Sequence, residues 1–305
     1  MKVLITGGAG FIGSAIAPLF QNNNCEVFVL DNLSFGNRDF LTSLDEQHFF
    51  ERDIRNYKDT LEVLQLIEPD VVIHLAAIHF IPYCNEHPYE ISDINIRGTE
   101  NVLEAIKKVH SVSKVVFAST AAVYPISDIA VSETHEIRPL DIYGLTKLTG
   151  EWLCEKFYLQ TNIDTVVCRF FNAFGPNETN PHLIPEIDNQ LMLGTRTLKL
   201  GNLTPKRDFI HTHDMADAVY RLVSLEHTGF DVFNLGRGIE YAVTEVVDAF
   251  SKILGEDISI QIDQSRVRKV ERQHLLADVS KLKAIGWEPK HSLEEGIQDM
   301  INNWK

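Results

Sequence analysis

The residues best suited to chemistry in this chain are Tyr143 and Lys147, together with Thr120, which follows Ser119 at the end of an apolar strand. Tyr143 and Lys147 are four residues apart, so on a helix they lie on one face. A lysine ammonium beside a phenol stabilises the phenolate and lowers the pKa of the phenol, which makes it a usable base near neutral pH. Thr120 could share the same substrate oxygen. Because the spacing alone also fits a solvated helix face, its meaning depends on the elements that position it.

A glycine-rich turn follows the opening strand, with Gly7, Gly10 and Gly13 at the spacing G-x-x-G-x-x-G. Glycine allows the tight turn, a close approach of phosphate to the backbone, and close packing of the next helix, whose free N–H groups suit an anion. An ordinary strand-to-helix turn has the same spacing. Asp31, however, ends the next strand about twenty residues later, where a carboxylate can accept hydrogen bonds from both ribose hydroxyls. Its charge would repel a 2′-phosphate, so the pattern favours NAD over NADP.

Strands and helical segments alternate along the first half of the chain. Apolar runs predict strands at 2–5, 26–30, 49–51, 70–77, 114–119 and 165–171, and helical periodicity predicts helices at 57–67, 94–109 and 143–159. This alternation predicts right-handed βαβ units and an α/β fold, a doubly wound parallel sheet of Rossmann type. Asp53 and Ile54 then lie where an adenine could be held.

Beyond Asn172 the alternation loosens, and glycine and proline punctuate short helices. A helix at 208–224 and a strand at 232–235 could rejoin the main sheet. Helices near 244–254 and 293–304 would cap the cofactor domain. We therefore expect residues 1–172 plus 209–238 to form an NAD-binding Rossmann-type domain. Residues 173–208 plus 239–305 would form a second, smaller mixed substrate-binding region, with the substrate in the cleft between them.

The composition narrows the class of protein. The 305 residues, 44% of them hydrophobic, can bury a large core, and the net charge of −15 argues against nucleic acid and anionic membrane surfaces as partners. No run is apolar and long enough to span a bilayer, and Met1 leads straight into a strand instead of a signal peptide, which predicts a cytoplasmic protein. The four cysteines lack C-x-x-C spacing and are expected to be reduced thiols.

One further motif has the spacing of metal ligands. The sequence His211-Thr212-His213-Asp214 resembles a metal-binding pair, but no third cluster of ligands is visible beside it. The sequence therefore predicts no metal site.

The motifs occur in the order and at the separations of the extended short-chain dehydrogenase/reductase family, and the chain resembles its NAD-dependent epimerase/dehydratase members from end to end. Further matches are Asp53-Ile54, Leu75-Ala76-Ala77, Asn95, Arg169-Phe170-Phe171-Asn172 with Gly175-Pro176, and the run from Arg207 to His211. The resemblance implies a nucleotide-sugar enzyme that holds NAD tightly. Tyr143 would be its acid and base, Lys147 would also bind the nicotinamide ribose, and Thr120 would orient the sugar hydroxyl.

The resemblance also implies two sets of binding residues. The cofactor set comprises Gly7, Gly10, Phe11, Ile12, Gly13, Asp31, Asn32, Ser34, Asp53, Ile54, Leu75, Ala76, Ala77, Asn95, Ser119, Tyr143, Lys147 and Phe170. The substrate set comprises His79, Thr120, Tyr143, Asn172, Leu183, Arg207, Arg268 and Glu271. Arg207 and Arg268 would clamp the diphosphate, since the guanidinium fork suits it. His79 lies where many 4-epimerases have a lysine or another cofactor contact.

One departure from related enzymes bears on the reaction. Sugar 4,6-dehydratases and nucleotide-glucuronate decarboxylases carry acidic residues just after the catalytic Ser or Thr, and here those positions are Ala121 and Ala122. Alanine can neither remove a carbon-bound proton nor protonate a leaving hydroxyl, so elimination is disfavoured.

The favoured function is a nucleotide-sugar 4-epimerase that uses resident NAD through a 4-keto intermediate. The intermediate size of Leu275, in a segment that gates the sugar 2-substituent in similar epimerases, favours a plain UDP-hexose. A nucleotide-sugar ketoreductase, dehydrogenase or dehydratase is the alternative enzyme, and an NAD(H)-sensing scaffold is the alternative without catalysis. The resemblance further implies a homodimer, for which apolar positions such as Val102, Leu148 and Leu153 could pair between subunits.

Overall fold

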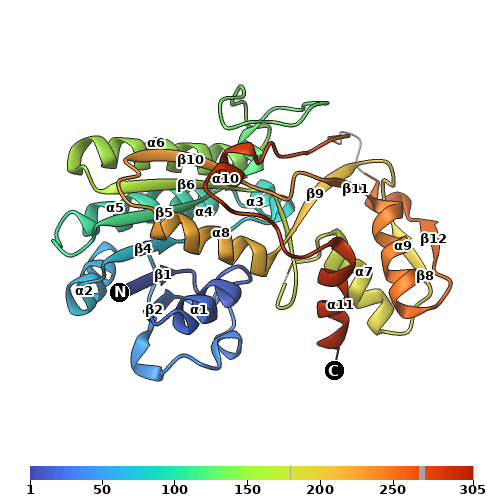
Figure 1. Cartoon of the computed structure of the whole chain (residues 1–305), viewed down its shortest axis with the longest axis horizontal. Coiled ribbons are helices and arrows are strands. Elements are labelled where there is room, and N and C mark those ends of the chain that lie inside the picture. Colours follow the sequence, from blue (N-terminus) through green and yellow to red (C-terminus); the bar gives the residue numbers. More distant parts are fainter. Residues whose placement is uncertain (179, 268–271, 305) are drawn as a thin grey trace. The chain divides into compact units, whose positions relative to one another are not determined.

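The computed structural model describes residues 1–178, 180–267 and 272–304, and the chain divides into two compact units (Figure 1). Unit 1 comprises Met1–Pro125, Glu136–Phe170 and Ala216–Phe233. Unit 2 comprises Ile126–His135, Phe171–Met215 and Asn234–Lys305. Of the predicted site residues, Arg268 and Glu271 lie outside the described residues.

Unit 1 is built on a seven-stranded sheet, which confirms the predicted Rossmann-type α/β fold. Its strands are β1 (Lys2–Thr6), β2 (Glu26–Asp31), β3 (Phe49–Glu51), β4 (Val71–His74), β5 (Lys114–Thr120), β6 (Asp164–Phe170) and β10 (Phe230–Leu235), in the order β10-β6-β5-β4-β1-β2-β3. The pairs β1 with β2, β1 with β4, β2 with β3, β4 with β5 and β5 with β6 are parallel. The strand order reverses between β1 and β4, the position where ligands bind in open α/β sheets.

Helices pack on this sheet through their apolar faces. They are α1 (Gly13–Asn22), α2 (Tyr57–Ile67), α3 (Ile81–Glu86), α4 (Pro88–Ser92), α5 (Gly98–Ile106), α6 (Ile142–Thr161) and α8 (Thr212–Ser224). One buried cluster joins α2, α5 and α6 to strand residues such as Leu4, Val115 and Phe117. Between α1 and α8, the ring of Phe20 meets that of Tyr220 edge to face, with centroids 5.1 Å apart.

Unit 2 combines two small sheets with helices. β7 (Asn172–Phe174), β9 (Lys206–His211) and β11 (Glu240–Ala242) form one sheet, and β8 (Thr197–Leu200) pairs with β12 (Ser259–Ile262) in the other. The helices are α7 (Leu183–Met192), α9 (Val243–Leu254), α10 (Ser280–Ala284) and α11 (Leu293–Asn302). The helix predicted from residue 208 is wrong in its first turn, because β9 pairs with β7 and β11 up to His211 and α8 begins only at Thr212.

Two other sequence expectations concern the surface and the membrane. Val102 and Leu148 are 1% and 5% exposed, so their proposed role in pairing subunits is wrong: they pack within their own chain. On α6 the exposed apolar side chains are Leu145, Trp152 and Leu159. Within the described ranges, no helix is both long and apolar enough to cross a bilayer.

Candidate active site

The glycine-rich turn joins β1 to α1 in a conformation that requires its glycines. Gly7 has φ +72°, and a Cβ there would lie 2.6 Å from the Cα of Ala76, in the loop after β4. A Cβ on Gly13 would lie 2.5 Å from the carbonyl oxygen of Gly8. Within the described chain, the N–H groups of Phe11 and Ile12 donate to no protein acceptor. The start of α1 therefore presents free N–H groups in the way that suits a diphosphate.

Asp31, at the end of β2, is held beside this turn. Its carboxylate accepts hydrogen bonds from the amides of Ala9, at 3.0 Å, and Leu33, at 2.8 Å. Burial raises the pKa of Asp31, and these backbone donors partly offset that rise. Each carboxylate oxygen has a second lone pair, so the group retains acceptor capacity for ribose hydroxyls.

The neighbouring polar residues Asn32 and Asp53 contact each other. The Asn32 amide donates to Asp53 at 2.9 Å, and Arg55 also binds Asp53, which lowers the pKa of that carboxyl to about 2. Ser34 donates its backbone N–H to Asn32. The side chain of Ile54 is buried, 5% exposed, and packs against Gly98 so closely that a Cβ on Gly98 would lie 2.5 Å from its terminal methyl. Only the backbone of Ile54 is therefore left to face a ligand.

Thr120 and Tyr143 meet at the carboxyl end of β5. Asp141 caps α6 by accepting the N–H of Gly144 at 2.8 Å, which fixes the helix start one residue before Tyr143. Thr120 Oγ1 accepts the N–H of Ala122 at 3.1 Å, and the Thr120 hydroxyl lies close enough to Tyr143 to act on its phenol, where it opposes the rise in pKa caused by burial. An ionisable phenol, Tyr143, therefore lies beside a hydroxyl, Thr120, and both could contact the same oxygen of a substrate.

Lys147 lies one helical turn beyond Tyr143 and is 3% exposed. Its ammonium lies 4.4 Å from the centre of the Phe117 ring, and burial lowers its pKa to about 8. Burial raises the pKa of Tyr143, and Lys147 is not among the groups that shift it. The predicted lowering of the phenol pKa by Lys147 is therefore wrong for the protein chain alone, because desolvation of the phenol outweighs the effect of neighbouring groups.

A buried ionic network beneath these residues was missed by the sequence interpretation. Glu151 accepts two hydrogen bonds from the guanidinium of Arg169, at 2.9 and 2.7 Å, and a third from the Ser119 hydroxyl. Arg169 also donates to the hydroxyl of Tyr124 at 2.9 Å. Glu151 follows Lys147 by four residues and so continues the same helix face, which is the signal that could have revealed it. The Ser119 hydroxyl, predicted to bind cofactor, is engaged with Glu151.

Asn95 lies in a π-helical turn, Asp93–Arg97, and is 1% exposed. Its side chain exchanges hydrogen bonds with the backbone of Ile78, at 2.9 and 3.0 Å, and donates to Thr146 at 3.1 Å. It thereby ties the loop after β4 to α6. Both amide hydrogens are used within the protein, so we regard Asn95 as a residue that positions the site.

His74, at the end of β4, is a second residue that sequence reasoning missed. Its ring nitrogens contact the hydroxyls of Thr6, at 2.6 Å, and Thr99, at 2.9 Å. Burial, together with the charge of Lys147, lowers the pKa of His74 to about 3, so the ring is neutral. It joins the ends of β1 and β4 to α5 without adding charge to the site.

The remaining predicted residues divide between the two units. His79, Leu75 to Ala77 and Phe170 belong to unit 1, whereas Asn172, Leu183 and Arg207 belong to unit 2. Arg207 donates to the carbonyl of Arg272 at 2.8 Å, and Leu275 is half-buried.

Asp208, next to Arg207, organises this part of unit 2. Its fully buried carboxylate accepts backbone N–H groups from Arg237, Gly238 and Ala277, at 2.7, 2.8 and 3.2 Å. Burial raises its pKa to about 6, against the opposing effect of these donors. Asp208 thus ties two segments that are far apart in sequence, Arg237-Gly238 and the one at Ala277, to β9.

Comparisons with known proteins agree with this geometry. Residues 4–300 match the family model described as GDP-mannose 4,6 dehydratase. The chain is 33% identical to a putative UDP-glucose 4-epimerase of Methanocaldococcus jannaschii, over 98% of this chain and 97% of that protein. Among solved structures, it is similar to the UDP-glucose 4-epimerase of Thermus thermophilus in complex with NAD (TM-score 0.89, 29% identity, 100% and 99% of the two chains). It is also similar to that of Thermotoga maritima with UDP-glucose (TM-score 0.91, 28% identity, 99% and 98%). The chain therefore belongs to the NAD-dependent epimerase/dehydratase family.

Proposed function

We propose that this protein is a nucleotide-sugar 4-epimerase that works with resident NAD. The observation that carries the proposal is the proximity of Thr120 and Tyr143 at the carboxyl end of β5, in the same unit as the glycine-rich turn and Asp31. The relatives named UDP-glucose 4-epimerases, which align with nearly the whole chain, support the same reaction class.

The turn and Asp31 fit the dinucleotide. The free N–H groups of Phe11 and Ile12 would hold its diphosphate, and Asp31 would accept hydrogen bonds from the adenosine ribose. Bound NAD supplies a hydride acceptor and a positive charge on its nicotinamide ring. Lys147 would hold the second ribose, and with a pKa of about 8 it is mostly protonated at neutral pH.

The chain's own residues then move the proton. Tyr143 takes the proton of the sugar 4-hydroxyl as the 4-hydride leaves, and it returns the proton when the hydride returns to the other face of the sugar. Thr120, beside Tyr143, would orient the same sugar hydroxyl. Since burial raises the pKa of the phenol, the positive charge of the bound cofactor would be what makes the phenolate accessible.

The residues after Thr120 favour epimerisation over elimination. Ala121 is 2% exposed, and both Ala121 and Ala122 lie in the short helical turn Ala121–Val123 that follows β5. Neither methyl group can carry the proton that a dehydratase must remove from carbon or deliver to the leaving hydroxyl. We therefore assign epimerisation although the matching family model is described by a dehydratase.

For the substrate we propose a UDP-hexose without a 2-acetamido group. The names of the relatives support the uridine nucleotide, and the half-buried Leu275 is larger than a side chain that would admit the acetamido group freely. Asn172, Leu183 and Arg207, with Arg268 and Glu271, would bind it.

The test is to incubate purified protein with UDP-glucose, UDP-galactose and their N-acetyl analogues and to follow the sugars by NMR. We expect interconversion of the plain pair without added cofactor, and bound NAD that survives gel filtration. Turnover only with stoichiometric added cofactor would instead indicate a ketoreductase or dehydrogenase. No turnover despite bound NAD would favour the scaffold.

We also propose a homodimer, now through a different face of α6. Leu145, Trp152 and Leu159 are 47%, 59% and 72% exposed, and their spacing of seven residues places them in one stripe. A second copy of the chain would cover this stripe. Sedimentation equilibrium at micromolar concentration should give twice the chain mass of 34.6 kDa, and a monomer would contradict the proposal.

A further inference from the structure

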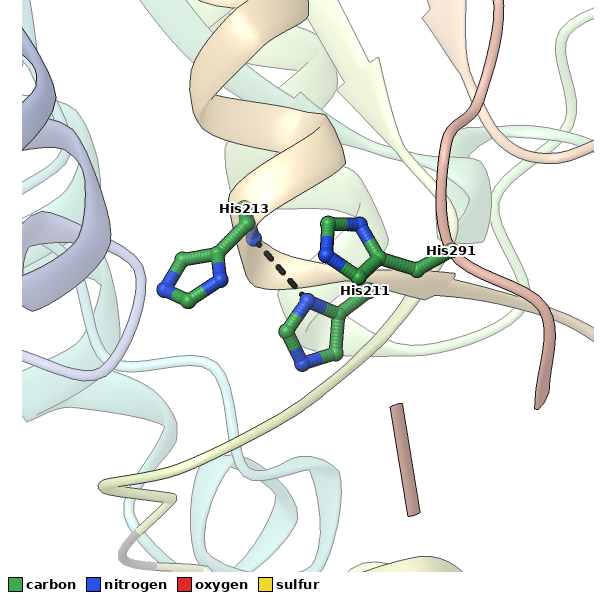
Figure 2. Close-up of side chains that lie close together, drawn as sticks. All are labelled: His211, His213 and His291. Atoms are coloured by element: carbon green, nitrogen blue, oxygen red, sulfur yellow. Dashed lines mark hydrogen bonds between the residues drawn. The ribbon is translucent and has the colours of Figure 1, made fainter. Parts of the chain in front are cut away.

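Three histidines lie together within unit 2. His211 ends β9, His213 follows two residues later in the first turn of α8, and His291 lies just before α11. Figure 2 shows the rings of His211 and His291 next to each other, with His213 close by and its ring turned away from His291. One ring nitrogen of each lies within 4.8 Å of those of the other two. The ring centroids are 4.9 Å apart for His211 and His213, 4.6 Å for His211 and His291, and 5.8 Å for His213 and His291.

His291 is held in this cluster by Asp214, which is 1% exposed. The Asp214 carboxylate accepts the N–H of Lys290 at 3.1 Å and that of His291 at 3.0 Å, and it contacts Nδ1 of His291 at 2.8 Å. Trp287 also donates its indole N–H to the Asp214 carbonyl. The carboxylate holds the His291 proton on Nδ1, which leaves the lone pair of Nε2 available.

His211 also has a carboxylate near its outer nitrogen, but without the hydrogen bond that holds His291. The ring is fully buried, and its Nε2 lies 3.4 Å from Oδ2 of Asp299. Gly296 allows α11 to approach the His211 ring closely, because a Cβ on residue 296 would lie only 2.9 Å from that ring. With its proton on Nε2 toward Asp299, Nδ1 has its lone pair directed toward the cluster, where it accepts one long hydrogen bond, 3.4 Å, from the backbone N–H of His213 (Figure 2). A metal ion would replace this bond.

Two imidazoles whose outer nitrogens each face a carboxylate, beside a third imidazole, form the arrangement in which proteins hold transition metals. Histidine rings that only packed against one another would need neither Asp214 nor Asp299 beside them. Nitrogens bound to zinc at about 2.0–2.1 Å in a tetrahedron are about 3.3 Å apart, so the rings must close slightly. His213 is exposed and free to turn inward. Asp214 and Asp299 together would balance the two positive charges of the ion.

We propose that His211, His213 and His291 bind one divalent transition-metal ion of the zinc class, with a fourth position open to water. The site joins β9, α8 and the segment before α11, so it stabilises unit 2. It uses none of the residues that move the proton or bind the cofactor, and it is independent of the proposed function.

The experiment titrates chelator-treated protein with Co²⁺, whose visible d–d absorption reports tetrahedral coordination, and with Zn²⁺ by calorimetry. We expect one ion per chain and a melting temperature that rises with Zn²⁺. His213→Gln, at an exposed position, and His291→Gln should each weaken binding by about 100-fold or more, and His110→Gln, an exposed histidine of unit 1, should leave it unchanged. Absence of one-to-one binding to wild type at micromolar metal would overturn the proposal. Wild-type affinity in His213→Gln would do the same.

Discussion

The two units fix their polar side chains by different means. In unit 1 the side chains stand at strand ends and along one face of α6, where Tyr143, Lys147 and Glu151 follow one another every four residues. In unit 2 buried aspartates hold irregular segments by their backbone amides, as Asp208 and Asp214 do. The first arrangement follows from sequence periodicity, whereas the second depends on contacts between distant segments.

The largest expected effect is at the chemical centre of unit 1. Tyr143→Phe removes only the phenolic oxygen, so the turnover number should fall about 1000-fold, or about 4 kcal/mol in activation free energy, while the fold and bound NAD persist. Steady-state kinetics and the absorbance of released cofactor measure both. Tyr158→Phe, which removes a hydroxyl farther along α6, is the control. A Tyr143→Phe enzyme with near-wild-type turnover would disprove the acid–base assignment.

The next effect concerns the stability of unit 1. Glu151→Gln leaves the Arg169 guanidinium, 3% exposed, without its counter-charge, so the free energy of unfolding should fall by about 3–5 kcal/mol. Urea denaturation measures it, with the exposed Glu155→Gln on the same helix as control. The double variant Glu151→Leu, Arg169→Met should recover much of the loss. An unfolding free energy unchanged in Glu151→Gln would show that the ion pair is not needed.

A smaller, pH-dependent effect should mark unit 2. The folded-state pKa of Asp208, about 6, exceeds the unfolded value of 3.8, so the protonated carboxyl contributes stability that is present below about pH 4 and lost as the pH rises through about 6. Asp208→Asn removes this dependence. The difference in unfolding free energy between wild type and Asp208→Asn should therefore favour wild type more at about pH 4.5 than at about pH 7, by on the order of 2 kcal/mol.

Urea denaturation at the two pH values tests this, with the exposed Asp257→Asn of the same unit as control. A wild-type advantage that is equal at both pH values would mean that Asp208 titrates like an ordinary carboxyl in the folded chain.

The smallest effect concerns the choice of cofactor. Wild-type protein should release NAD on denaturation, because the Asp31 carboxylate repels a 2′-phosphate. Asp31→Asn keeps an acceptor for the turn but removes the charge, so the preference for NAD over NADP should fall at least about tenfold, or about 1.4 kcal/mol. Mass spectrometry of released nucleotide and titration of cofactor-free protein measure it. Mainly NADP in the wild type would show that Asp31 does not set the preference.

Sequence patterns predicted most of unit 1 because its fold repeats a simple period. The apolar strands, the glycine spacing and the helix face of Tyr143 and Lys147 are all local signals. The roles of His74 and Glu151 were missed because their partners are brought close only by the parallel sheet and the helices on it.

In unit 2 the local signal was misleading. Residues 208–211 precede a helix and were predicted to be helical, yet they pair in β9 with strands that are distant in the sequence. His291 was not connected with His211 and His213 for the same reason. Pairing and convergence of this kind depend on the tertiary fold, which a periodic pattern does not contain.

The central claim, reversible hydride transfer at the sugar C4 assisted by Tyr143, is tested most directly with UDP-glucose that carries deuterium at C4. The labelled sugar is incubated with wild-type protein and an excess of unlabelled NAD, and both epimers are examined by NMR. The account predicts UDP-galactose that retains deuterium at C4, because the hydride returns to the carbon that it left within one active site. Loss of the label from C4 to water or to the dissolved cofactor would contradict it.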